Sequence, residues 1–174
     1  MTTLELPRLS RESAILTDVQ GRLDRLLPEM EVSDGVLEAI ANLAIHRDRL
    51  AIQAFTRDAQ MLSSILQAME SFPSVPAGRG KGFEARVQGV VKVVEDIQAK
   101  LEGLAQDVRE VSRESAHPDV RALRGPLLDV IASLFDNMER RRWELLEQEA
   151  DAAIASGRIK TFDSHADVMA FLRA

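Results

Sequence analysis

Few residues of this chain have the types and spacing that chemistry requires, and the clearest motif is Glu114-Ser-Ala-His117. An E-x-x-H on one helix can direct both side chains at a single metal ion. Di-iron helical bundles use two such motifs together with two further carboxylates. This chain has one, next to Pro118 at a predicted helix end. The other histidines, His46 and His165, are expected to be solvated or hydrogen-bonded within the fold, so no metal site is predicted.

A second candidate is the loop Gly78-Arg-Gly-Lys-Gly82, which has the glycines and cations of a phosphate cradle. A P-loop needs Ser or Thr after its lysine and a strand before the loop. Here Gly82 follows Lys81, and no strand pattern precedes the loop, so a flexible turn between helices is the simpler expectation. No Ser-His-Asp set or paired carboxylates stand out. The sequence therefore predicts no catalytic residues, no cofactor and no enzymatic activity.

Composition further narrows the class of fold and the kinds of partner that the sequence predicts. The chain has 174 residues, 45% of them hydrophobic but only 4% aromatic, as helix-on-helix packing prefers. A net charge of −6 disfavours a general nucleic-acid binder, which needs a basic surface to neutralise phosphates. The basic run Arg140-Arg-Arg142 is expected to form a solvated face with the glutamates around it. With no cysteine and no long apolar run, the expectation is a cytoplasmic protein without a membrane partner.

Apolar periodicity predicts helices over most of the chain, at roughly 11–27, 34–72, 83–116 and 119–156. Ser10 and Ser33 are candidate N-caps, and Pro28 should end the first helix. The segment 73–82 is rich in proline and glycine and is the one clear break. Three long helices of similar length with short connections predict an all-α fold. We expect an elongated antiparallel bundle, with the shorter first helix as a partial fourth member.

The third helix has the cleanest pattern, a coiled-coil seam that is expected to be buried along its length. In the fourth helix, Gly125-Pro126 predicts a kink or an early break. The second helix has two adjoining apolar faces, which predicts a neighbour on each. The seam residues of the third helix are Phe83, Val87, Val90, Val94, Ile97, Leu101, Leu104, Val108 and Val111.

The last residues differ in character, and they divide the chain into a bundle, 1–156, and a C-terminal segment, 157–174. Gly157 is a natural helix stop. The stretch that follows, 158–162, is predicted to be extended, and Ser164 can cap a short final helix. Val168, Phe171 and Leu172 form one apolar stripe on that helix. A strand and a helix this small cannot fold alone, so the segment must dock on its own bundle or on another protein.

This segment resembles the toxin-neutralising tail of bacterial type II antitoxins of the RelB and AbrB-like classes. In those proteins a helix leads through a Gly-[Arg/Glu]-x-Lys-Thr-Phe-[Asp/Ser] link into a short acidic helix. The resemblance covers residues 145–174 and implies a small, basic, toxin-like protein as the partner, bound by strand addition and helix-in-groove docking. The matching link residues are Gly157, Arg158, Lys160, Thr161, Phe162, Asp163 and Ser164. The implied partner-binding residues are Arg158, Ile159, Lys160, Phe162, Val168, Phe171 and Leu172.

The first 50 residues depart from that family. Such antitoxins begin with a compact DNA-binding domain, whereas this chain begins with long helices, so operon DNA binding is not implied. The alternative is a structural or adaptor bundle that binds partner helices or oligomerises. In that case the tail would seal the end of its own bundle.

Overall fold

A computed structural model describes residues 9–29, 36–72, 82–158 and 164–172, and these residues form six α-helices and no strand. Because the described residues are almost entirely helical, the all-α prediction is confirmed. The predicted extended segment 158–162 lies outside this part of the chain, apart from Arg158. The helices are α1 Ser10–Glu29, α2 Val36–Glu70, α3 Phe83–Glu114, α4 Pro118–Ala122, α5 Arg124–Ala155 and α6 His165–Leu172.

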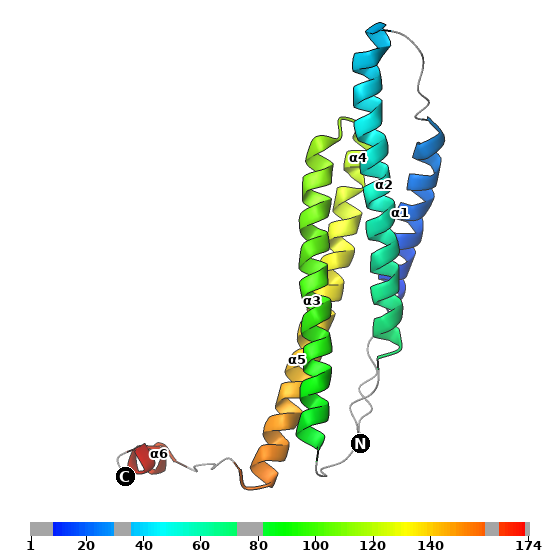
Figure 1. Cartoon of the computed structure of the whole chain (residues 1–174). Helices are drawn as coiled ribbons and strands as arrows, with labels where there is room; N and C mark the ends of the chain where they lie inside the picture. The colour runs from blue at the N-terminus through cyan, green and yellow to red at the C-terminus, as the bar shows by residue number, and fades with distance from the viewer. Residues whose placement is uncertain (1–8, 30–35, 73–81, 159–163, 173–174) are drawn as a thin grey trace.

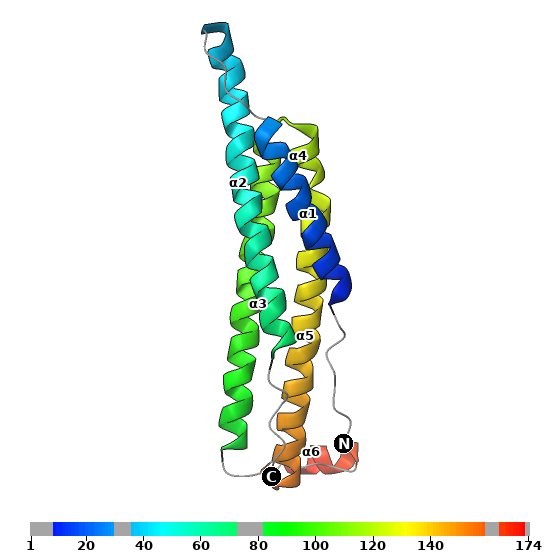
Figure 2. The ribbon, with the colours of Figure 1, turned by 90° about the vertical axis from the view of Figure 1, so that its right-hand side faces the viewer.

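Helices α1, α2, α3 and α5 run alternately up and down and form an elongated antiparallel bundle (Figure 1). Helix α1 packs on α2 and α5, and α3 packs on the same two helices from the other side (Figure 2). The pair with the most extensive packing is α3 with α5. Polar bridges fix the register of that pair, including Gln98 Nε2 to Glu139 Oε2 at 2.7 Å and Arg142 Nε to Glu95 Oε1 at 3.3 Å.

The four helices are staggered, so they surround a shared core only along the middle of the bundle. Helix α1 has 20 residues against 35 in α2 and 32 in α3 and α5. The start of α2 projects beyond the other helices at one end, and α3 and α5 continue past α2 at the other (Figure 1). Asp48 of α2 is level with the α3–α4 connection, to which it is hydrogen-bonded. The preceding residues 36–47 therefore project by about 18 Å at 1.5 Å per residue.

Two predicted helix ends differ from the structure. Pro28 lies inside the last turn of α1, which continues to Glu29, so the helix does not stop before this proline. A proline lacks a backbone N–H, and it disfavours the α conformation at the preceding residue without forbidding it. The last turn of a helix can therefore accommodate a proline. Ser10 is the first helical residue, because the carbonyl of Leu9 already accepts the N–H of Ser13 at 3.1 Å.

The early break predicted in the fourth helix is confirmed, but it falls at Leu123, just before Gly125-Pro126. Pro126 thereby sits in the first turn of α5, where its missing N–H has no intrahelical acceptor to lose. Pro118 occupies the equivalent favourable place in α4. One long predicted helix is thus two helices, α4 and α5.

The buried face of α3 is rotated from the predicted seam. Val87, Val94, Leu101, Leu104 and Val108 are buried in both, but Val91, Gln98, Ala105 and Ser112 replace the other seam residues on the buried face. Ile97, which the seam prediction buries, is only partly buried. Helix α3 packs against two neighbours, so its buried face is centred between them and not on its most apolar line. The buried residues are Val87, Val91, Val94, Gln98, Leu101, Leu104, Ala105, Val108 and Ser112.

Helix α2 has the two neighbours that the sequence predicted, α1 and α3, but one of its two apolar faces is buried only in part. Phe55, Leu62 and Met69 are fully buried on the face that meets α1 and α3. On the other face Leu43 is 63% exposed and Leu50 52%, whereas Ile65 further along the helix is buried. The described residues therefore leave the part of that face around Leu43 and Leu50 largely uncovered.

Candidate partner-binding site

The tail begins where α5 is ended by a Schellman motif at Gly157, as the sequence predicted. Gly157 has φ 70°, a left-handed conformation that L side chains rarely adopt. Its N–H donates to the carbonyl of Ile154 at 2.9 Å, and the N–H of Arg158 donates to that of Ala153 at 3.0 Å. These two bonds satisfy the last carbonyls of α5 and turn the chain away from the helix axis.

Arg158 is the only predicted partner-binding residue of the link that lies within the described residues. Its side chain is exposed and forms an ion pair with Glu84 in the first turn of α3. Its Nε also donates to Ser156 Oγ at 3.0 Å. Arg158 therefore holds the start of the tail against the ends of α3 and α5.

The other predicted partner-binding residues are described in part or not at all. Ile159, Lys160 and Phe162 lie outside the described residues. Val168 is half-buried on α6; Phe171 and Leu172 belong to the same helix, but their side chains are not described. The carbonyl of Ser164 accepts the N–H of Val168 at 3.3 Å, which places Ser164 at the predicted N-cap position of α6.

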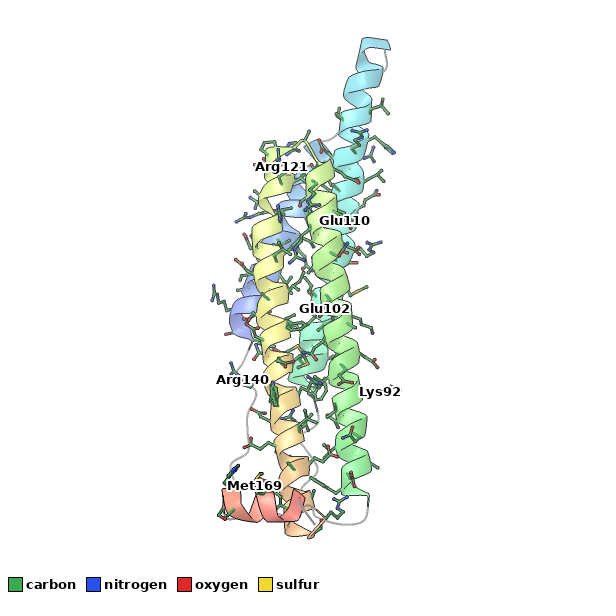
Figure 3. All side chains as sticks on the ribbon, turned by 90° about the vertical axis from the view of Figure 1, so that its left-hand side faces the viewer. Lys92, Glu102, Glu110, Arg121, Arg140 and Met169 are labelled. Atoms are coloured by element: carbon green, nitrogen blue, oxygen red, sulfur yellow. The ribbon has the colours of Figure 1, made fainter. Side chains whose placement is uncertain are left out.

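Helix α6 is not one of the helices that pack together in the bundle. It lies to one side of the lower end of α5 (Figure 1), and Figure 3, viewed from that side, shows Met169 on it. The structure therefore places the described part of the tail beside the bundle, and not between its helices.

The residues of the E-x-x-H motif do not share a helix. Glu114 is the last residue of α3, whereas His117 is the N-cap of α4. His117 Nδ1 accepts the N–H of Asp119 at 3.3 Å, which occupies one ring nitrogen in capping. No group of three or more potential metal-ligating side chains is found in the described part of the chain.

Asp48, in the middle of α2, holds the α3–α4 connection in place through hydrogen bonds. Asp48 is only 7% exposed, and its Oδ1 accepts the hydroxyl of Ser115 at 2.6 Å. The same oxygen accepts the N–H groups of Ala116 at 3.2 Å and His117 at 3.4 Å. Asp48 is therefore a structural acceptor, and His46 beside it is exposed.

The basic run of α5 is only partly the solvated face that the sequence predicted. Arg142 is ion-paired with Glu95 and Glu139, as expected for such a face. Arg141, in contrast, is 4% exposed and occupies the place in the buried stripe between Met138 and Leu145. Of the glycine-rich loop, only Gly82 is described. It precedes α3 with φ 90°.

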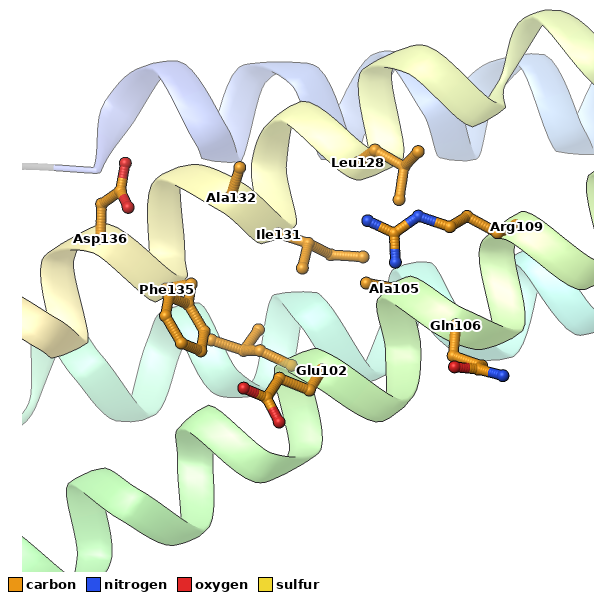
Figure 4. Close-up of a pocket in the computed structure, with 10 residues that line it drawn as sticks. Glu102, Ala105, Gln106, Arg109, Leu128, Ile131, Ala132, Phe135 and Asp136 are labelled. Atoms are coloured by element: carbon orange, nitrogen blue, oxygen red, sulfur yellow. The ribbon is translucent and has the colours of Figure 1, made fainter.

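A groove between α3 and α5 was not foreseen from the sequence. It has a volume of about 400 Å³ and opens on the surface midway along the pair (Figure 4). Two small residues facing it, Ala105 and Ala132, could have indicated a gap, but alanine is common in helices and carries little signal by itself. The lining residues are Leu101, Glu102, Ala105, Gln106, Arg109, Leu128, Ile131, Ala132, Phe135 and Asp136.

The core contains one carboxyl group with incomplete hydrogen bonding. Asp58 is fully buried, its Oδ1 lies 3.4 Å from Arg57, and its Oδ2 has no hydrogen-bond partner in the described structure. Burial raises the pKa of Asp58. Arg57 partly offsets this, and the Asp107 carboxylate raises the pKa further.

Replacing Asp58 with Asn is expected to stabilise the protein at neutral pH, because the amide has nearly the same shape and carries no charge to desolvate. The pKa of Asp58 is higher in the folded protein than in the unfolded chain, so protonation of this carboxyl stabilises the fold. This stabilisation is fully present below the ordinary pKa of an aspartate. That stabilisation is lost as the pH rises through the folded pKa. The gain of Asp58→Asn should therefore be small in acid and grow with pH. Urea unfolding across this pH range measures it, with Asp129→Asn as the control for the loss of an exposed carboxylate from the surface.

Fold and tail together define an elongated helical bundle with a C-terminal helix set apart from it. No protein-family model, curated protein or solved structure matches the chain. None of the described helices is long and apolar enough to cross a membrane.

Proposed function

We propose that this chain is a non-catalytic protein-binding module in which the bundle is a platform and the tail captures a small partner protein. The observation that carries the proposal is the position of α6, which is separate from the packed helices while bearing an apolar stripe. A helix of 8 residues is too short to be stable alone in water. It gains stability when its apolar side chains are covered, and a partner protein can provide that cover.

The resemblance of the tail to antitoxin tails makes a small basic toxin-like protein the proposed partner. The bundle ends α5 with a defined turn and holds Arg158 against Glu84. The link therefore starts from a fixed point. A fixed start lowers the ordering cost that a tail pays when it binds.

The tail residues Phe162 and Phe171 test this function. Replacing both with serine should change the free energy of unfolding by less than about 0.5 kcal/mol, the usual effect of surface substitutions. The same change should abolish capture of a co-expressed small basic toxin-like protein. Urea unfolding and affinity capture of the co-expressed pair measure the two effects.

A matched control is Trp143→Ser, which removes an aromatic side chain that is 63% exposed on the bundle and should leave capture intact. If the tail instead seals the bundle, the double serine variant should lose about 3–5 kcal/mol for each buried aromatic. That loss, without a captured partner, would overturn the proposal.

A second candidate function is an adaptor bundle that binds partner helices or a second copy through α2. The observation that favours it is the uncovered line of Leu43, Leu50 and Met61, which are 63%, 52% and 41% exposed. Substituting Leu50 and Met61 with glutamate separates the two functions. If the protein is an adaptor, this variant should lose its partner or its oligomeric mass. If the protein binds its partner through the tail, capture of that partner should be unchanged.

A further inference from the structure

We propose that the groove between α3 and α5 binds a small amphipathic carboxylate, with an apolar body over the groove floor and its anionic head on Arg109. This site is distinct from the tail and does not depend on the proposed partner. Its volume of about 400 Å³ lies within the range of small-molecule sites.

The groove exists because α3 and α5 place small side chains where larger ones would fill the gap. Ala105 and Ala132 lie on the two facing helices, and around them are larger apolar side chains (Figure 4). Leu101 and Ile131 are buried at 0% and 4% exposure and form the floor. Leu128 and Phe135 are half-buried and extend the apolar surface towards the two ends. Covering this surface with an apolar body is favourable because it removes apolar area from water. The floor side chains have no polar group that could hydrogen-bond to such a body.

The charges around the groove are separated along its length. Arg109 reaches over the end that contains Leu128, whereas Glu102 and Asp136 lie towards the end that contains Phe135 (Figure 4). Residues 102 and 109 are one heptad apart, about 10 Å along the helix. One end therefore attracts an anion and the other repels one.

Arg109 is available for an external anion. Its side chain is exposed and forms no ion pair with the residues that the structure describes. A guanidinium presents a planar pair of donors that matches a carboxylate in a bidentate arrangement. Because Glu102 and Asp136 repel a second negative group, the ligand that fits has one carboxylate and an uncharged apolar remainder. A chain of about eight carbons spans the distance of one heptad.

Octanoate, below its micellar concentration, is the probe that tests the site on the full chain. Methyl-resolved NMR should show saturable shifts at Ala105, Ala132 and Leu128. Protonated octylamine, which has the same chain and the opposite charge, should bind at least tenfold more weakly. Equal binding of the two probes, or shifts scattered through the bundle core, would overturn the proposal.

Two variants make the test specific. Arg109→Glu should weaken octanoate at least tenfold and improve octylamine, because the groove would then have acidic groups at both ends. Ala132→Leu should block both ligands by filling the groove from an exposed position. Thermal melts of both variants should match the parent protein, since neither residue is buried. Unchanged octanoate binding in folded Arg109→Glu would show that Arg109 does not recognise the carboxylate.

Discussion

Truncating Leu101 to alanine is expected to lower the free energy of unfolding by about 2–5 kcal/mol. Leu101 is fully buried in the middle of α3, where that helix packs between α2 and α5. This loss of free energy has two parts, the burial that the removed side-chain atoms no longer contribute and the cost of the cavity left among the surrounding helices. Urea unfolding monitored by helical circular dichroism measures it directly.

The control is Ile97→Ala on the same helix. Ile97 belongs to the predicted seam but is only partly buried, so we expect a smaller loss of about 1–2 kcal/mol. Equal losses at the two positions would mean that the predicted seam, and not the rotated face of the structure, is the packed one.

Replacing Asp48 with alanine is expected to cost about 2–4 kcal/mol, because three donors at the α3–α4 connection lose Asp48 Oδ1 as an acceptor. Of the three, the N–H of His117 keeps a second acceptor, Ser115 Oγ at 3.3 Å. The Ser115 side chain is buried with Asp48, so water cannot easily replace the lost bonds. Amide hydrogen exchange at Ala116 and His117 should accelerate in the variant by more than it does elsewhere in α3.

Asn at position 48 retains one oxygen acceptor and should recover part of the lost stability. Ser115→Ala removes one of the three bonds and should cost less than Asp48→Ala. If all three variants lost the same amount, Asp48 would contribute through its packing and not through its hydrogen bonds.

Helix formation was predictable because it depends on local sequence. Apolar spacing, the break at residues 73–82 and the glycine stop at Gly157 each act within a few residues, so the order of the long helices followed from the chain alone. The break near Gly125-Pro126 was predictable for the same reason, although its position at Leu123 was not.

The rotation of α3 was not predictable from its own periodicity. Gln98 and Ser112 are polar, yet both are buried, because Gln98 bridges to Glu139 of α5 and the hydroxyl of Ser112 donates to the carbonyl of Arg109. A pattern that counts only apolar residues assigns such positions to the surface. Burial of Arg141 within the stripe of α5 escaped the prediction for the same reason.

The features of the tail also fall into those that its sequence predicted and those that only the tertiary structure shows. Its sequence alone predicted the stop at Gly157 and the capped final helix, since both depend on short-range hydrogen bonds. Only the tertiary structure shows that Arg158 is tied to Glu84, a residue 74 positions away. The groove likewise exists only when α3 and α5 are brought together, because neither Ala105 nor Ala132 leaves a gap until a second helix faces it. Local hydrogen bonding and periodicity determined which segments are helical. The way those helices pack decided which faces are buried and which surfaces stay open to a ligand or a partner.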